Sequence, residues 1–267
     1  MIRLVAIDVD DTLINHKLEI SPENLQAIQA TQAKGVRVML ATGRMHISAL
    51  PYAKQLALPP DEAILSYNGA MLRRINGELI AHIAVEYELA KAVIRYCQAE
   101  NWTLNIYFED KLYVEQMNDN VEYYIRNANV DAIVVGDLLE FIAENQKALS
   151  KLLIVGTEAE IAQRFPIVTE RFGAIAQVTR SKSRYIELTH NQASKGITLA
   201  NYAKSLGIAS AQVLAIGDSG NDLTMLQYAG IGVAMGNGNR AVQEIADYVT
   251  RTNEESGVAS ALRRFVL

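Results

Sequence analysis

Three carboxylates stand close together near the start of the chain, immediately after a short apolar run. Residues 4–7 are all apolar, as in a buried strand of a parallel sheet, and Asp8, Asp10 and Asp11 follow them. Two like charges about 4 Å apart repel by about 4 kcal/mol at an effective dielectric constant near 20, so a fold gathers them where a cation or a reaction uses them. The alternative is a strand that ends in a solvated acidic turn. The other strand ends of the sequence distinguish these interpretations.

Residues that could contribute to a site follow three further segments that are mainly apolar and that we expect to be strands. These segments are residues 36–41, 63–66 and 213–216. Taken alone, each of these strand ends is more typical of a turn than of a site. The carboxyl ends of parallel strands lie along one edge of a sheet, however, so the four strand ends are expected to meet there. The residues that follow the three segments are Thr42, Gly43 and Arg44, then Asn68, and finally Asp218, Asn221 and Asp222.

The charges of these candidate residues predict what the site contains. Four carboxylates stand against one lysine, Lys195: those of Asp8, Asp10, Asp218 and Asp222. A divalent cation with oxygen ligands fits the remaining negative charge, and Mg²⁺ fits it best. With Mg²⁺ and Lys195 present, such a site accepts a phosphate, to which Thr42 and Asn68 would donate hydrogen bonds. Phosphate-ester chemistry is therefore the expected function.

The elements that must position these residues form two parts. Apolar segments alternate with helical patterns in residues 1–84 and again in residues 189–267, which predicts βαβ units and a Rossmann-like parallel sheet. Between them, residues 85–188 alternate short strands with helices and include a hairpin around Glu109 and Asp110, as in an α+β module. We therefore expect an α/β catalytic core interrupted by an inserted cap domain.

Two serines and one proline mark helix ends and breaks. Ser21 and Ser194 are typical N-cap residues, which predicts helices that begin at Pro22 and Lys195. A helix over about residues 158–172 is expected to bend or break at Pro166, because proline lacks the amide hydrogen that a helix interior uses.

The order of the motifs resembles that of the haloacid dehalogenase (HAD) superfamily. Its four ordered motifs are similar to residues 8–12 (Asp-Val-Asp-Asp-Thr), residues 42–44 (Thr-Gly-Arg), Lys195 and residues 217–222 (Gly-Asp-Ser-Gly-Asn-Asp). The inserted module and the segments at residues 68–70 and 234–237 resemble the Cof-type subgroup, subclass IIB, which carries a large α/β cap between the second and third motifs. The resemblance covers nearly the whole chain.

The resemblance implies a magnesium-dependent phosphatase that acts on a small phosphorylated metabolite, either a sugar phosphate or a nucleotide-type monoester. Asp8 would attack phosphorus to form an aspartyl-phosphate, and Asp10 would protonate the leaving oxygen and then activate water. Thr42 and Lys195 would hold the phosphoryl group. The other implied positions are Gly43, Arg44, Asn68 and Asn221 around the phosphate, and Asp8, Asp10 (through its main-chain carbonyl), Asp218 and Asp222 around Mg²⁺.

Several alternatives stay open at this point. Asp11 stands where many superfamily members have glycine, so a turn with positive φ would be less comfortable, although aspartate tolerates it better than most residues. Arg44 equally suits a surface ion pair. Phosphotransferases and phosphomutases share the aspartyl-phosphate step. A non-catalytic phosphometabolite-binding protein is less favoured, because it predicts loss of the nucleophile or the metal ligands and none is lost.

One group of tyrosines in the inserted module also has two interpretations. The residues either line a sugar or nucleotide pocket or pack as ordinary half-buried aromatics, and the second is favoured. They are Tyr107, Tyr113, Tyr123, Tyr124 and Tyr185.

The composition limits partners and location. The chain has 267 residues, 50% of them hydrophobic, and a formal net charge of −5 with no lysine or arginine cluster, so neither nucleic acid nor a membrane is an expected partner. No signal-peptide pattern or bilayer-spanning apolar run is present, which favours the cytoplasm. Cys97 is the only cysteine and is expected to be a packed thiol. We expect a monomer or weak homodimer with a small-molecule phosphorylated substrate.

Overall fold

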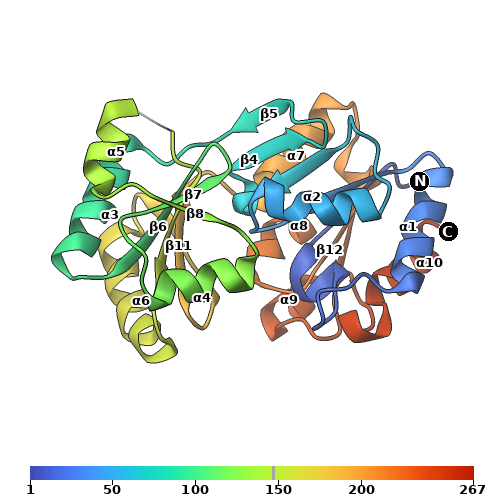
Figure 1. Cartoon of the computed structure of the whole chain (residues 1–267). Coiled ribbons are helices and arrows are strands. Elements are labelled where there is room, and N and C mark those ends of the chain that lie inside the picture. Colours follow the sequence, from blue (N-terminus) through green and yellow to red (C-terminus); the bar gives the residue numbers. More distant parts are fainter. Residues whose placement is uncertain (146–147) are drawn as a thin grey trace. The chain divides into compact units, whose positions relative to one another are not determined.

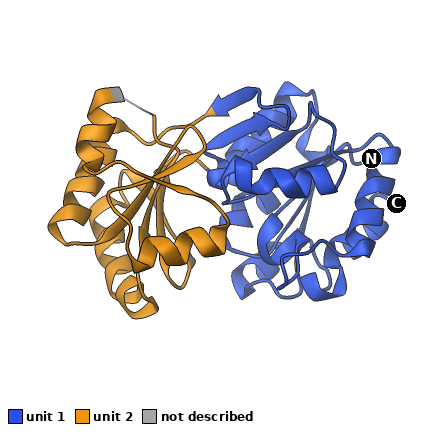
Figure 2. Ribbon diagram, viewed as in Figure 1, with its two compact units in different colours: residues 1–81, 194–267 blue, residues 82–193 orange. Residues whose placement is uncertain are grey.

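The computed structural model describes residues 1–145 and 148–267 and divides the chain into two compact units (Figure 2). The first unit comprises Met1–Ala81 and Ser194–Leu267, and the second comprises His82–Ala193. The second unit is a few residues longer at each end than the cap drawn from the sequence. At one end His82 Nε2 lies 3.0 Å from Ser150 Oγ, and at the other the last strand continues to His190.

The first unit is built on an eight-stranded sheet with the order β14-β13-β12-β1-β2-β3-β4-β5. Figure 1 labels β4, β5 and β12 of this sheet. Neighbouring strands are parallel from β14 to β3, whereas β3 and β4 are antiparallel. The predicted Rossmann-like parallel sheet is therefore confirmed. The strands are β1 (Leu4–Ile7), β2 (Arg37–Ala41), β3 (Ala63–Ser66), β4 (Met71–Arg74), β5 (Leu79–His82), β12 (Val213–Gly217), β13 (Ile231–Ala234) and β14 (Tyr248–Val249).

Helices cover both faces of this sheet, as in a doubly wound α/β fold. One apolar cluster joins three helices to alternate strand residues such as Val5, Ile7 and Leu40, and a second cluster joins three others to Leu4 and Met39 on the opposite face. The helices of the first cluster are α1 (Pro22–Ala33), α2 (His46–Gln55) and α10 (Gly257–Phe265), and those of the second are α7 (Lys195–Ser205), α8 (Leu223–Tyr228) and α9 (Arg240–Ile245).

The two predicted N-caps begin their helices as expected. Ser21 Oγ accepts a hydrogen bond from the Asn24 N–H at 3.2 Å, and Ser194 Oγ accepts one from the Ile197 N–H at 3.1 Å. Each bond satisfies an amide that the first turn of a helix would otherwise leave unpaired. The cap at Ser194 fixes the start of α7, and therefore the position of Lys195, the first residue of that helix.

The second unit contains a six-stranded sheet with the order β10-β11-β9-β6-β7-β8. Its strands are antiparallel from β10 to β7, and β7 and β8 are parallel. The predicted hairpin is present, because β6 and β7 pair on either side of Glu109 and Asp110. The strands are β6 (Thr103–Phe108), β7 (Lys111–Val114), β8 (Ala132–Val134), β9 (Lys151–Val155), β10 (Ala176–Lys182) and β11 (Tyr185–His190).

The two faces of the second sheet differ in chemistry. Leu104 and Ile106 of β6 point into an apolar core with α3 (Tyr87–Ala99), α5 (Leu138–Asn145) and α6 (Glu158–Phe172). The opposite face carries Thr103, Asn105 and Tyr107, because successive strand residues alternate between faces. Helix α4 (Asp119–Ala128) packs on this second face, where the rings of Tyr124 and Tyr107 lie 6.3 Å apart.

Helix α6 runs through Pro166 without interruption, so the predicted break is wrong. The helix begins with a capping box, in which Thr157 Oγ1 accepts from the Glu160 N–H and Glu160 Oε2 accepts from the Thr157 N–H. Ile161, Val168 and Phe172 then bury one side of the helix in the apolar core. These contacts offset the cost of proline in a helix interior, about 3 kcal/mol. No helix of the described part of the chain is both long and apolar enough to cross a bilayer.

Cys97 of α3 is expected to resist thiol reagents in the folded protein. Its side chain is 1% exposed, and burial raises the pKa of the thiol to about 12. At pH 8 the thiolate fraction is then about 10⁻⁴, against about one quarter for an ordinary cysteine. Labelling with a disulfide reagent at pH 8 should therefore be negligible in buffer and complete in denaturant. Equal labelling rates in the two solutions would contradict the packing of this thiol.

Candidate active site

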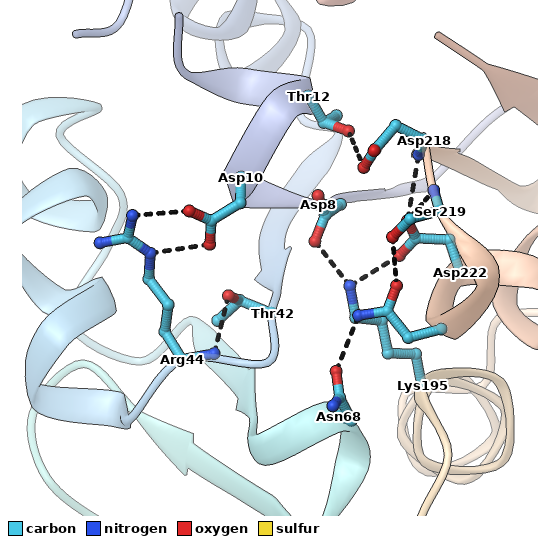
Figure 3. Close-up of polar contacts among 11 residues, drawn as sticks. Asp8, Asp10, Thr12, Thr42, Arg44, Asn68, Lys195, Asp218, Ser219 and Asp222 are labelled. Atoms are coloured by element: carbon cyan, nitrogen blue, oxygen red, sulfur yellow. Dashed lines mark hydrogen bonds and ion pairs between the residues drawn. The ribbon is translucent and has the colours of Figure 1, made fainter. Parts of the chain in front are cut away.

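The sheet of the first unit brings the predicted strand ends together. Asp8 follows β1, Thr42 follows β2, Asn68 lies two residues beyond β3, and Asp218 follows β12. These four strands are consecutive neighbours in the order β12-β1-β2-β3 and run parallel, so their carboxyl ends share one edge. Figure 3 shows the resulting group of side chains.

Lys195 connects two of the carboxylates. Its Nζ lies 2.6 Å from Asp8 Oδ1 and 2.6 Å from Asp222 Oδ1, and its side chain is fully buried (Figure 3). A buried ammonium needs such partners, because an unpaired charge in a protein interior is strongly unfavourable. Lys195 therefore connects the residue that follows β1 with the segment after β12, although the two are far apart in the sequence.

The pKa values of this group reflect burial and mutual charge. Burial is the main cause that raises the pKa of Asp8, the Asp222 carboxylate raises it further, and Lys195 opposes them. Burial would lower the pKa of Lys195, but the charges of Asp222 and Asp8 outweigh it and raise that pKa. The lysine thus stays charged, and its charge is what favours the ionised form of Asp8.

Asp222 has a second set of contacts besides Lys195. Its Oδ2 accepts hydrogen bonds from the backbone N–H groups of Asp218 and Ser219, each at 3.0 Å. The carboxylate therefore fixes the turn that follows β12 and, with it, the direction of Asp218. Both oxygens of Asp222 are bonded to groups of the chain, so Asp222 positions its neighbours.

Three carboxylates could hold a metal ion. One oxygen each from Asp8, Asp218 and Asp222 lies within 4.8 Å of the others. Burial and the charge of Asp222 raise the pKa of Asp218 to about 7, which marks a carboxyl group short of positive charge. An all-oxygen donor set with surplus negative charge fits a hard divalent cation such as Mg²⁺. The side chain of Asp10 is not part of this group.

The Asp10 carboxylate is held by Arg44 instead. Arg44 Nη2 donates to Asp10 Oδ1 at 2.7 Å and Arg44 Nε donates to Oδ2 at 2.8 Å, a bidentate ion pair (Figure 3). Burial would lower the pKa of Arg44, but the hydrogen bonds and charge of Asp10 outweigh it and raise that pKa. This ion pair is partly buried and its partner is the expected proton carrier, so it differs from the surface ion pair that was the alternative for Arg44.

The remaining candidates line the adjoining part of the edge. Asn221 Nδ2 donates to Asn68 Oδ1 at 2.9 Å, which links the turn after β12 to the turn after β3. Thr42 is buried, and its Oγ1 accepts the Arg44 N–H at 3.0 Å. At Gly43 a Cβ atom would lie 2.9 Å from Asn68 Oδ1, so glycine lets the Asn68 side chain approach.

Gly69 fits the turn after β3 against the start of α7. Its φ is +104°, and a Cβ atom there would lie 2.3 Å from the Ser194 carbonyl oxygen. The Thr198 hydroxyl donates to the Gly69 carbonyl at 2.7 Å in the same contact. The turn that carries Asn68 and the helix that carries Lys195 are therefore packed backbone to backbone.

Sequence reasoning assigned no role to three residues that hydrogen-bond to the segments around the acids. Thr12 Oγ1 donates to Asp218 Oδ1 at 3.2 Å, and Ser219 Oγ donates to Asn221 Oδ1 at 2.6 Å. Asn237 Nδ2 donates to the Asp11 carbonyl at 2.7 Å, and Asp11 has a φ of +55°. Thr12 and Ser219 belong to the motifs already noted, and this membership is the feature of the sequence that could have identified them.

The first unit is doubly wound, carries clustered acids and a buried lysine at its carboxyl edge, and is interrupted by a second unit. This combination is typical of the HAD hydrolase fold. The family model for haloacid dehalogenase-like hydrolases matches residues 5–262, and the chain belongs to this family. The resemblance drawn from the four motifs is thereby confirmed.

Individual relatives are similar to this chain over nearly its full length. The 5-amino-6-(5-phospho-D-ribitylamino)uracil phosphatase YcsE of Bacillus subtilis is 31% identical over 268 residues, which cover 100% of this chain and 96% of that protein. The crystal structure of TM0651 from Thermotoga maritima is similar with a TM-score of 0.89 and 31% identity, covering 100% of this chain and 98% of that one. The HAD subclass IIB sugar phosphatase BT4131 is similar with a TM-score of 0.82 and 25% identity, covering 98% of both chains.

Proposed function

We propose that this hydrolase is a magnesium-dependent phosphatase that acts on a small phosphorylated metabolite through an aspartyl-phosphate on Asp8. One observation carries the proposal: the Asp8 carboxylate is buried at the edge of the sheet, bonded to Lys195 at 2.6 Å and grouped with the acids of Asp218 and Asp222. The phosphatase names of the relatives support the same reaction.

In the proposed reaction, Asp8 acts as the nucleophile. An oxygen of its carboxylate forms a bond to phosphorus while the ester P–O bond breaks, and the electron pair leaves with the alcohol oxygen, which takes a proton from Asp10. Water then attacks phosphorus, gives its proton to Asp10 and frees the Asp8 carboxylate with release of inorganic phosphate. Lys195 favours the ionised form of Asp8 before it attacks, and it keeps the side chain oriented during both steps.

Mg²⁺ would be held by Asp8, Asp218 and the main-chain carbonyl of Asp10, with Asp222 fixing the turn around it. When bound, the ion supplies positive charge that offsets the carboxylates and the phosphoryl oxygens. Thr42, Gly43 and the pair Asn68–Asn221 are the proposed phosphate contacts, because their backbone and amide groups can donate hydrogen bonds at the same sheet edge.

Arg44 links substrate binding to the proton carrier in this proposal. A carboxylate in a bidentate ion pair is stabilised in its ionised form, so Asp10 donates a proton only after Arg44 releases it. The phosphate of the substrate is a dianion that competes for the same guanidinium. Once released, the Asp10 carboxylate would take up a proton from water and pass it to the leaving oxygen.

We also propose that the second unit acts as the cap that selects substrates, with residues 82–193 supplying the side chains that recognise the part of the substrate beyond the phosphate. This division suits the chain, since each unit has its own apolar core and the acids and Lys195 all belong to the first unit.

The test is release of inorganic phosphate from an aryl phosphate. We expect turnover with about 5 mM Mg²⁺. The rate of phosphate release should fall about 100-fold or more when a chelator removes the metal, and it should recover when excess Mg²⁺ is returned. Product analysis with added alcohol or sugar acceptors separates hydrolysis from phosphoryl transfer. Absence of turnover across aryl, sugar and nucleotide phosphates with Mg²⁺ present would contradict the proposal.

A further inference from the structure

One turn of the first unit contacts both of the segments that carry the acids of the site. This turn comprises residues 235–239, which follow β13. On one side the Asn239 N–H donates to the Asp218 carbonyl at 2.9 Å. On the other side Asn237 Nδ2 donates to the Asp11 carbonyl at 2.7 Å. The turn is therefore placed to fix the segment after β1 relative to the segment after β12.

The side chain of Asn237 is itself held in place. Its Oδ1 accepts a hydrogen bond from the Asn253 N–H at 2.9 Å, and Asn253 Nδ2 donates to the Ile14 carbonyl at 3.0 Å. Asn253 is only 2% exposed, so packing fixes its position as well. The amide of Asn237 can make both of its bonds in one orientation only, because exchanging its nitrogen and oxygen would break both. Asn237 thus offers its N–H group to Asp11 from a rigid support.

The bond to Asp11 matters because of the backbone conformation of that residue. Asp11 has a φ of +55° and a ψ of 10°, a left-handed conformation that is unfavourable for a residue with a Cβ atom. The peptide that joins Asp10 to Asp11 carries the Asp10 carbonyl, the proposed main-chain ligand of Mg²⁺. A change to negative φ at Asp11 would rotate this peptide and change the direction of its carbonyl. A contact that keeps Asp11 left-handed therefore also keeps the carbonyl of Asp10 in position.

We propose that Asn237 is a positioning residue for the Mg²⁺ site, because it holds Asp11 in the left-handed conformation and so fixes the direction of the Asp10 carbonyl. This inference rests on the proposed function, in which that carbonyl is a ligand of the metal. The same segment also contacts a second proposed ligand, since the Thr12 hydroxyl donates to Asp218 Oδ1 at 3.2 Å (Figure 3). Asn237 itself touches neither the metal nor the substrate in this proposal and acts only through the backbone.

Asn237→Ala is expected to weaken Mg²⁺ binding while leaving the fold intact. Without the amide, Asp11 would relax to negative φ in most molecules that lack the metal, and the affinity falls by the fraction that keeps the binding conformation. If about one molecule in ten keeps it, the Kd for Mg²⁺ rises about tenfold. Calorimetric titration with Mg²⁺ measures this Kd without any turnover. Because Asn237 is exposed, the melting temperature in chelator should fall by less than about 2 °C.

Asn24→Ala is the matched control, because it removes a bond of the same kind from the same segment. Asn24 Nδ2 donates to the Leu13 carbonyl at 3.2 Å, its Oδ1 accepts from the Ala259 N–H at 2.9 Å, and its side chain is fully buried. This variant should lower the melting temperature more than Asn237→Ala does, yet change the Kd for Mg²⁺ by less than about twofold. If Asn237 had a merely structural role, the two variants would rank in the same order in both measurements.

A change of Asp11 tests the mechanism directly. Asp11→Gly should make Asn237 less important, because glycine adopts positive φ about as readily as negative φ. In that background Asn237→Ala should raise the Kd for Mg²⁺ only about twofold. An equal effect in both backgrounds would overturn the inference, and so would a Kd for Asn237→Ala within about twofold of that of the unchanged protein. Either result leaves the phosphatase function standing if the unchanged protein binds Mg²⁺ and releases phosphate with it. An unchanged protein that binds no Mg²⁺ would contradict both the inference and the proposed metal dependence.

Discussion

Asp8→Asn is expected to abolish turnover while leaving the fold intact. The substitution keeps the shape of the side chain and an oxygen that can accept from Lys195, but an amide cannot form the covalent bond to phosphorus. We expect kcat to fall by about 10⁴-fold or more, as when other enzymes lose a nucleophile. Steady-state phosphate release measures the loss of turnover, and a thermal unfolding curve shows whether the fold is intact.

Asp11→Asn is the matched control for this change. It alters a carboxylate three positions further along, in a residue that is exposed and has a φ of +55°. Asparagine tolerates this conformation at least as well as aspartate, so the control should keep activity within about twofold. If Asp8→Asn retained more than about 1% of the activity, attack by Asp8 would be wrong. Equal losses in both variants would instead indicate a general effect of charge at this strand end.

Lys195→Met is expected to weaken the whole fold as well as the site. The lysine is fully buried between Asp8 and Asp222, and methionine removes its charge while keeping a long apolar side chain. Breaking a buried ion pair from one side leaves uncompensated charge that costs about 3–5 kcal/mol. Urea unfolding followed by circular dichroism should show a loss of this size, and phosphate release should become undetectable.

Lys204→Met on the same helix provides the comparison. Lys204 lies in the last turn of α7 and is exposed, so its replacement should change stability by less than about 0.5 kcal/mol. Added Mg²⁺ should raise the melting temperature of the Lys195 variant more than that of the unchanged protein, since Asp8 and Asp222 then lack the charge of the lysine. A Lys195 variant as stable as the Lys204 variant would show that the acids are balanced in some other way.

Much of the first unit could be predicted because its signals are local. The strands that lead to Asp8 and Asp218 are continuous apolar runs, and Ser21 and Ser194 are strong N-caps. Other elements lacked such signals. Helix α2 contains Pro51, while β14 has only two residues and β5 has exposed side chains, so composition and periodicity do not reveal them. They form because neighbouring strands and the apolar core support them.

The meeting of the strand ends could be predicted, whereas the contacts of the individual side chains could not. Strand ends in a parallel sheet predict that Asp8 and Asp218 approach each other, and the structure places both in one acidic group. The partner of Asp10 could not be foreseen, because the direction of a side chain depends on rotamers and on residues elsewhere such as Arg44. The pairing of β6 with β9 is also invisible in the sequence, since it joins segments that lie far apart along the chain.

The contact of Gly69 with Ser194 has a consequence for how this protein can evolve. The chain leaves the first unit at Ala81 and returns at Ser194, yet the segments on either side of that excursion are joined directly, through a backbone approach and the bond from Thr198 to Gly69. The alignment of Asp8 with Lys195 is thus secured by residues outside the insertion. Mutations within residues 82–193 can therefore accumulate without disturbing the alignment of Asp8 with Lys195.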